Sequence, residues 1–144
     1  MKNSVLLFAL LFAGCATVPP EPVLFAAYEK YSRGVSSETI RDRYAEYFSR
    51  SLTDGNDMED KGILSQLLFK NLMKKVTSHH ENMRGSKGCL TVNGLDKEGG
   101  PLSFNLEYVP SAGFWLINAI RIFFAESVTD LSEEGKCPSD YIND

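Results

Sequence analysis

The chain has 144 residues, with 15 lysines and arginines against 19 aspartates and glutamates, and a formal net charge of −4. Its basic residues are scattered rather than gathered in one stretch, which argues against a nucleic-acid-binding surface. The sequence also contains no Gly-x-Ser-x-Gly nucleophile elbow, and no cofactor is expected.

The first fifteen residues have the layout of a secretory signal peptide. Lys2 is followed by nine apolar residues, Val5 to Ala13 (VLLFALLFA), and then by Gly14 and Cys15. Such a run is too short to cross a bilayer core of about 30 Å, so it predicts a cleaved signal rather than a membrane span.

The cysteine after the two small residues makes this segment resemble a bacterial lipoprotein signal, although Phe12 stands where the lipobox usually has leucine. The resemblance implies a signal peptide over residues 1–14, diacylglyceryl and palmitate-type acylation of Cys15, and a mature chain of 144 minus 14, or 130, residues. Ala16, rather than aspartate, follows the cysteine, which in similar proteins means the periplasmic face of the outer membrane. The alternative is an ordinary cleaved signal with a chance cysteine.

Residues 15–22 contain three prolines and no hydrophobic periodicity, which predicts an extended tether of about 20 Å. Residues 23–144 have the length of a single periplasmic domain. Within it, Cys89 and Cys137 form an even pair in an oxidising compartment and are predicted to be joined by a disulfide. Two free thiols or a metal pair are the alternative.

The first half of the domain shows helical spacing of apolar residues. It predicts one helix from Pro22 to Arg33, a second from Ser36 or Ser37 to Leu52, and a third that begins at Asp57, runs to Val76 and frays over residues 79–85. The third helix has the broadest apolar face, which includes Ile63, Leu64, Leu67, Leu68 and Leu72.

The second half alternates with a period of two, which predicts strands. Leu90 to Asn93 and Leu102 to Tyr108 form a hairpin with one face buried. Phe114 to Ala125 (FWLINAIRIFFA) suits a strand or a helix, and its isoleucines and aromatics favour a third strand. Helices followed by an antiparallel meander predict an α+β fold, with N-terminal helices packed on a curved antiparallel sheet.

Two segments carry a resemblance to the NTF2-like (cystatin-like) superfamily. They are Tyr44 to Phe48 (YAEYF) on a helix and Gly113 to Ile120 (GFWLINAI), which is similar to the Gly-x-Trp-x-Ile-x-x-Ile strand of that family. The resemblance spans residues 23–127 and implies an NTF2-like cone of helices and bent sheet. Because only three strands are evident, the cone is expected to be incomplete.

Candidate functional residues are few. His79 and His80 are the only histidines, and adjacent helical residues point about 100° apart, so they indicate a solvated helix end and not a metal site. Asn118 and Arg121 interrupt an apolar strand on opposite faces, and Asn118 is expected to face inward with Leu116 and Ile120.

The helical tyrosines offer amphipathic side chains for a cleft rim or an interface, with burial in the core as the alternative. We therefore take Tyr31, Tyr47 and Asn118 as a candidate binding surface. No catalytic residue is predicted. The expected function is that of a membrane-anchored periplasmic lipoprotein that binds a protein partner in the cell envelope. A small-molecule or lipid-binding NTF2-like domain is the alternative, and an NTF2-like enzyme is the third.

Overall fold

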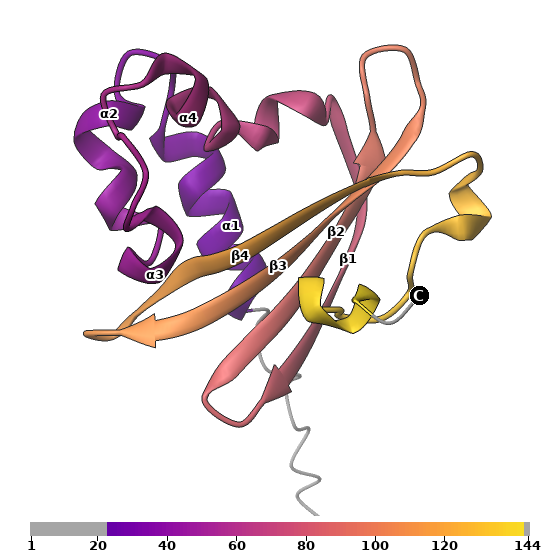
Figure 1. The fold of residues 1–144 in the computed structure, drawn as a ribbon. Helices are drawn as coiled ribbons and strands as arrows, with labels where there is room; N and C mark the ends of the chain where they lie inside the picture. The colour runs from indigo at the N-terminus through magenta and orange to yellow at the C-terminus, as the bar shows by residue number, and fades with distance from the viewer. Residues whose placement is uncertain (1–22, 143–144) are drawn as a thin grey trace, which may run out of the picture.

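The computed structural model describes residues 23–142, so the predicted signal peptide, Cys15 and the tether lie outside the described residues. The described part of the chain is an α+β domain, as predicted. Helices come first and cover one face of a four-stranded antiparallel sheet, and a C-terminal segment covers the other face (Figure 1). Within residues 23–142, no helix is both long and apolar enough to cross a membrane.

The helical layer is built from short pieces. The first predicted helix is confirmed as α1, but the second and third are wrong in extent, because each is broken into short helical segments. The elements of this layer are α1 (Val23–Gly34), α2 (Ile40–Arg43), η1 (Tyr44–Glu46), α3 (Arg50–Thr53), α4 (Lys61–Gln66) and η2 (Phe69–Leu72).

The second predicted helix is interrupted because its middle pairs with the sheet. The Ile117 amide donates to the Tyr47 carbonyl at 2.8 Å, and the Ser49 amide donates to the Ile117 carbonyl at 2.9 Å. These bonds take the place of helical ones, and the Ser49 hydroxyl then accepts the Leu52 amide to start α3. Tertiary pairing thus overrides the local helical pattern.

The third predicted helix ends much earlier than its apolar pattern suggests. The chain enters strand β1 (Lys75–Arg84), so residues 79–84 belong to a strand and not to a fraying helix end. The turn that follows is a hairpin in which Arg84 pairs with Lys87, and Gly85 adopts a positive φ of 61°. Glycine reaches this backbone conformation without steric cost, which fits a two-residue hairpin turn.

The sheet has the order β1-β2-β3-β4, with every neighbouring pair antiparallel. The three predicted strands are confirmed as β2 (Lys87–Leu95), β3 (Pro101–Ser111) and β4 (Phe114–Phe124), and β1 is a fourth that the sequence analysis missed. The apolar run over residues 114–125 is therefore a strand and not a helix.

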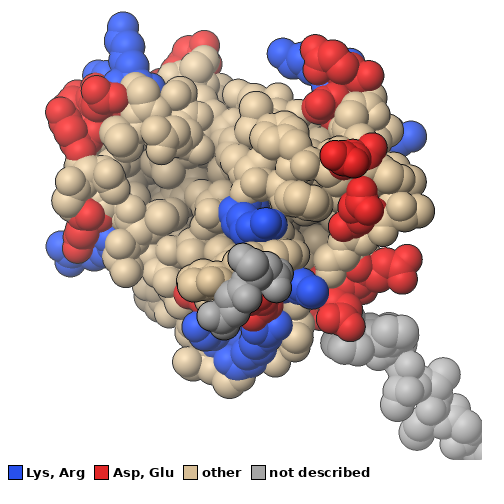
Figure 2. All heavy atoms as spheres, turned by 45° about the vertical axis from the view of Figure 1, so that its right-hand side comes forward, with Lys and Arg blue, Asp and Glu red and all other residues tan. Residues whose placement is uncertain are grey.

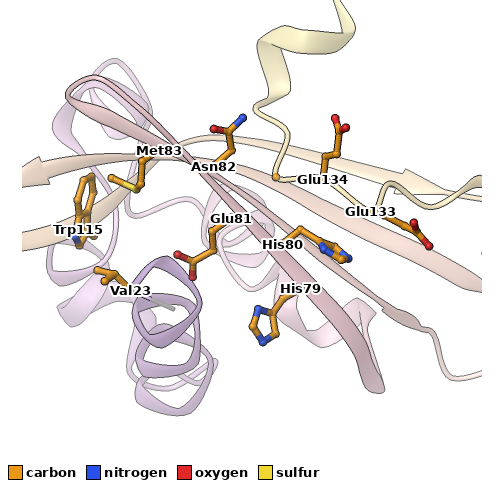
Figure 3. Close-up of a pocket in the computed structure, with 10 residues that line it drawn as sticks. Val23, His79, His80, Glu81, Asn82, Met83, Trp115, Glu133 and Glu134 are labelled. Carbon is orange, nitrogen blue, oxygen red and sulfur yellow. The ribbon is translucent and has the colours of Figure 1, made fainter. Parts of the chain in front are cut away.

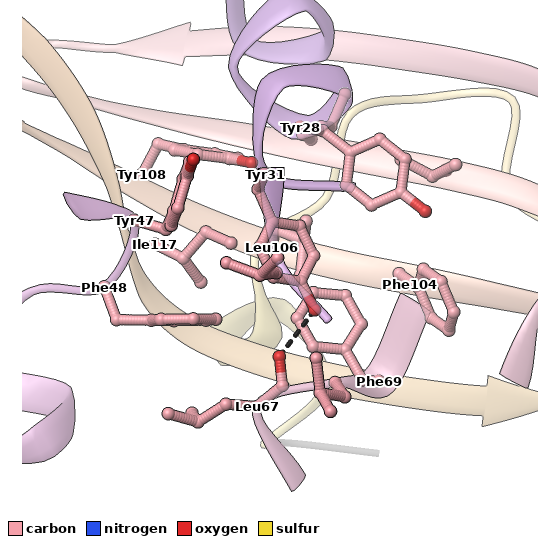
Figure 4. Close-up of a cluster of buried hydrophobic side chains, with 14 of the residues drawn as sticks. Tyr28, Tyr31, Tyr47, Phe48, Leu67, Phe69, Phe104, Leu106, Tyr108 and Ile117 are labelled. Carbon is pink, nitrogen blue, oxygen red and sulfur yellow. Dashed lines mark hydrogen bonds between the residues drawn. The ribbon is translucent and has the colours of Figure 1, made fainter. Parts of the chain in front are cut away.

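One face of the sheet, here called the helix-side face, carries the apolar core. Tyr31 stacks on Phe69 with ring centroids 5.1 Å apart, and Phe69 meets Phe104 of β3 edge-on at 5.0 Å (Figure 4). The Tyr31 hydroxyl donates to the Leu67 carbonyl at 2.6 Å, which satisfies its polar end inside the core. These contacts join α1 and η2 to the centre of the sheet.

The opposite face, here called the strap-side face, is polar and is covered by residues 125–142, which we call the strap. Buried side chains on this face include Thr91, Asn93, Ser103, Asn105 and Glu107. The predicted disulfide is confirmed, since Cys89 of β2 is joined to Cys137 of the strap with Cα atoms 4.6 Å apart.

Hydrogen bonds also fix the strap to the sheet. The Lys136 amide donates to the Thr91 hydroxyl at 3.0 Å, and the Asn93 side-chain amide donates to the Ser132 carbonyl at 2.8 Å. Gly135 allows the close approach, because a Cβ there would lie 2.5 Å from the Asn82 backbone nitrogen. The face that alternation predicted to be solvent-facing is thus buried.

Candidate functional site

An apolar groove lies on the helix-side face, between the helical layer and the edge strand β4. We call it the helix-side groove; its volume is about 720 Å³, within the range of small-molecule sites. Its apolar lining comes from α3, α4, the segment through η2, and β4. The residues are Leu52, Ile63, Leu67, Leu68, Phe69, Leu72, Ile120 and Ile122, with Asn56, Ser65, Gln66, Asn71 and Lys97 as polar neighbours.

The groove exists because the helical layer covers the sheet unevenly. On β3, Phe104 and Leu106 are fully buried, whereas their β4 partners Ile122 and Ile120 stay partly exposed. Across the groove, Leu72 at the end of η2 is 42% exposed. A fully extended third helix would present a longer apolar face, but the chain turns into β1 at Lys75 and leaves the β4 side uncovered.

The chemistry of this lining suits binding rather than proton transfer. Among the described residues that line the groove there is no aspartate, glutamate or histidine, and the single charged side chain is Lys97. Side chains of this kind gain free energy by covering apolar surface, at about 25 cal/mol per Å². The arrangement favours a ligand with a substantial apolar part.

A second hollow, here called the edge groove, runs along the outer strand β1 (Figure 3). It measures about 870 Å³, and five consecutive residues, 79 to 83, line it. Successive strand residues point to opposite faces, so His79 and His80 face different sides of the sheet. A compact ligand would not touch both, and the groove suits an extended chain instead.

Two polar side chains at the edge groove, those of His79 and Glu81, already have structural partners. His79 stacks on Phe25 with ring centroids 3.7 Å apart and planes 7° apart. The Glu81 carboxylate accepts the Phe25 amide at 2.6 Å, which places negative charge in the first turn of α1. Across residues 23–142, no group of three or more histidine, cysteine, aspartate or glutamate side chains is placed to hold a metal ion.

Two of the three predicted binding-surface residues are core residues. Tyr31 is 1% exposed and Tyr47 is 5% exposed, so neither forms an outer surface. The physical reason is that α1 and the segment around Tyr47 both pack on the helix-side face, where the two rings meet edge-on at 6.0 Å. The prediction of an exposed tyrosine patch at these positions is corrected accordingly.

Asn118, the third predicted residue, sits where the β3–β4 register shifts and its side chain joins a polar chain of contacts. Its amide donates to Glu107 at 2.8 Å, its side-chain oxygen accepts the Ser49 hydroxyl at 2.6 Å, and Lys87 contacts the same carboxylate at 2.9 Å. Burial raises the pKa of Glu107, but the bonds from Asn118 and Lys87 outweigh it, and the pKa lies below its usual range.

This network ties β4 to β2, β3 and the start of α3, so Asn118 has a structural role and no open contact with either groove. Because of the register shift, Asn118 does not share a face with Ile120, and this part of the prediction is wrong. Arg121 lies on the strap-side face, where its guanidinium is 3.8 Å from the centre of the Tyr141 ring.

The helix-side groove was not predicted from the sequence, although part of its signal was present. The broad apolar face assigned to the third helix contains Ile63, Leu67, Leu68 and Leu72, all of which line the groove. When a segment has more apolar residues than a short helix can bury, some of its apolar surface is expected to stay uncovered. The residues of β4 that complete it became identifiable only with the strand register.

Comparisons with known proteins assign no family. No protein-family model matches the chain, and no curated protein matches it. Among solved structures, the chain is similar to a de novo designed β-sheet protein determined by solution NMR, with 12% sequence identity and a TM-score of 0.36. The similarity covers 74% of this chain and 85% of the designed protein, and at this TM-score it carries no argument about function.

Proposed function

We propose that this protein is a membrane-anchored lipoprotein of the periplasm whose single domain binds a ligand with an elongated apolar part in the helix-side groove. The observation that carries the proposal is the lining of that groove: it has eight apolar side chains, and the described residues that line it include no carboxylate and no imidazole. Covering such a lining is favourable for any apolar chain of matching size.

The anchor rests on the resemblance of residues 12–15 to a lipobox. Since α1 begins at Val23, only residues 16–22 separate the acylated cysteine from the folded domain. Seven residues of extended chain reach about 25 Å at most, so the domain works close to the membrane surface. Replacing Cys15 with serine should move the protein from the outer-membrane fraction to the soluble periplasm or leave it unprocessed. Retention in washed outer membranes would reject the anchor.

The finer fold proposal is an NTF2-like cone that is incompletely closed. Its support is the helical layer on one face of the sheet and the opening beside β4. The resemblance implies that an enzyme of this family would need a carboxylate in its cavity. Glu107 lies on the opposite face of the sheet from the helix-side groove, so we favour binding over chemistry.

A protein partner is the second candidate, and it belongs to the edge groove. An outer strand presents unpaired backbone N–H and C=O groups, and an extended segment of an envelope protein could add to β1 as a further strand. A photo-crosslinking residue at the exposed position Asn82 should then capture one envelope protein in cells. The same crosslinker at Glu59, exposed on the helical layer, should not.

The ligand proposal is tested with the full chain carrying Cys15→Ser, purified without detergent. Decyl maltoside below its micelle concentration serves as a neutral apolar probe, measured by calorimetry. Ile122→Asn places an amide in the groove and should weaken binding about tenfold or more, because the amide loses its water without gaining a partner. Phe123→Asn, the next residue on the opposite face, should leave the affinity unchanged.

Equal losses for Ile122→Asn and Phe123→Asn, at matched thermal stability, would show that the probe does not use the helix-side groove. Absence of any binding by the parent protein would reject the ligand proposal and leave the protein partner as the remaining function.

A further inference from the structure

We propose that the ligand of the helix-side groove carries a phosphate group at one end, held by Lys74 and Lys97. This inference rests on the proposed binding function and specifies its ligand as an amphiphile with one apolar chain and a phosphate head. It comes from a basic hollow that adjoins the groove.

The basic hollow has a volume of about 450 Å³ and lies beside the groove at the end of η2. Its lining residues are Ser32, Lys70, Asn71, Met73, Lys74 and Lys97. Asn71 and Lys97 also line the helix-side groove, so the two spaces share a wall. A molecule with its apolar chain between η2 and β4 can therefore place its other end among these lysines.

The charge of this region is opposite to that of the whole chain. The full sequence has more acidic than basic residues, yet no carboxylate lines the groove or the basic hollow among the described residues. Within residues 23–142, Lys74 and Lys97 make no ion pair and no side-chain hydrogen bond. Both side chains are exposed and available to an anion.

Two neighbouring charged side chains, Lys70 and Asp96, are already bonded to backbone groups. Lys70 donates to the carbonyls of Ser32 and Val35 at the end of α1, so its ammonium is held in place and adds positive charge to the wall. In the β2–β3 turn, the Asp96 carboxylate accepts the amides of Glu98 and Gly100.

Two ammonium groups from separate segments fit a head with several oxygens and more than one charge. Lys74 precedes β1 and Lys97 lies in the turn between β2 and β3, so they approach the hollow from different elements. Lysine is a common phosphate ligand, and a phosphate monoester carries about −1.5 to −2 charge at neutral pH. A phosphate head thus matches the site better than a neutral or zwitterionic one.

The test compares decyl phosphate with decyl maltoside, both below their micelle concentrations, on the full chain carrying Cys15→Ser. Decyl phosphate should bind about tenfold more tightly or better at low ionic strength, and the advantage should shrink with added salt. Lys74→Ala with Lys97→Ala should remove the advantage and leave decyl maltoside unchanged. Lys30 and Lys61 line neither the groove nor the basic hollow. The double variant Lys30→Ala with Lys61→Ala removes the same amount of charge and should keep the advantage of decyl phosphate.

Each contrary result has a distinct meaning. Equal affinity for the two amphiphiles overturns the phosphate head while leaving the groove as a binding site. If both double variants lose the tighter binding of decyl phosphate equally, the attraction is only long-range, and the proposal of a phosphate head is overturned as well. Inorganic phosphate that binds as tightly as decyl phosphate shows a free-phosphate site independent of the groove, and overturns the joint site.

Discussion

The two faces of the sheet are both covered, but different forces hold their covers in place. On the helix-side face, aromatic and aliphatic side chains are held by nondirectional apolar packing, as in the cluster of Tyr31, Phe69 and Phe104. On the strap-side face, specific hydrogen bonds and one disulfide fix a segment with little regular structure.

This difference explains where a ligand can enter. Nondirectional packing tolerates an incomplete cover, so the helical layer can stop short of β4 and leave the groove open. The strap has buried polar groups beneath it that require partners, so it lies close against the sheet. Figure 2, in which the right-hand side of Figure 1 comes forward, shows acidic and basic side chains in small separate groups, with basic groups also near the centre of the view.

The largest effect should come from breaking the packed face. Phe104→Ala removes a fully buried ring that contacts Tyr28 and Phe69, and should lower the free energy of unfolding by about 3–5 kcal/mol. Denaturant unfolding measures this change in the free energy of unfolding. Ser103 is the buried neighbour on the strap-side face, and Ser103→Ala is the matched control, which should lower the free energy of unfolding far less. Comparable losses from the two substitutions would remove the contrast between the faces.

Removing the disulfide should lower the free energy of unfolding less than Phe104→Ala does. It should also loosen the strap more than the rest of the domain. Cys89→Ala with Cys137→Ala should cost about 2–4 kcal/mol. Hydrogen exchange should accelerate at the Lys136 amide, which bonds to Thr91 under the strap, more than at the core strand β3. Uniform acceleration over both layers would mean that the strap is not a separate unit.

The smallest effect concerns the polar network of Glu107, which borders the strap-side face. Because the folded pKa lies below the unfolded value of about 4.3, the charged form stabilises the fold above that pH. Glu107→Gln should therefore cost about 1 kcal/mol at neutral pH, and the difference should vanish as the pH falls through the lower folded pKa. A difference that grows on acidification would contradict the network.

Sequence patterns predicted the strap-side link and the meander, because a cysteine pair and a period of two are local signals. They failed at residues 75–84, where apolar residues at helical spacing run directly into an edge strand. The Gly85-Ser86 pair between polar flanks was a hairpin signal that the helical pattern obscured. The burial of Tyr31 and Tyr47 depends on packing between distant segments, which no local pattern encodes.

The helix-side groove could not be predicted from the sequence for the same reason. Its apolar residues were visible as one broad helical face, but its far wall at Ile120 and Ile122 depends on the pairing of β4 with β3. A short helix and an edge strand make a groove only when their positions relative to each other are known.

The most direct test of the central claim is a titration of the isoleucine methyl signals by NMR with decyl maltoside, using the Cys15→Ser chain. Ile63, Ile120 and Ile122 line the helix-side groove, whereas Ile142 is 77% exposed at the end of the strap. Binding in the helix-side groove should cause saturable shifts at the three groove methyls and none at Ile142. Shifts that are largest at Ile142, or equal at all four, would contradict a ligand site on the helix-side face.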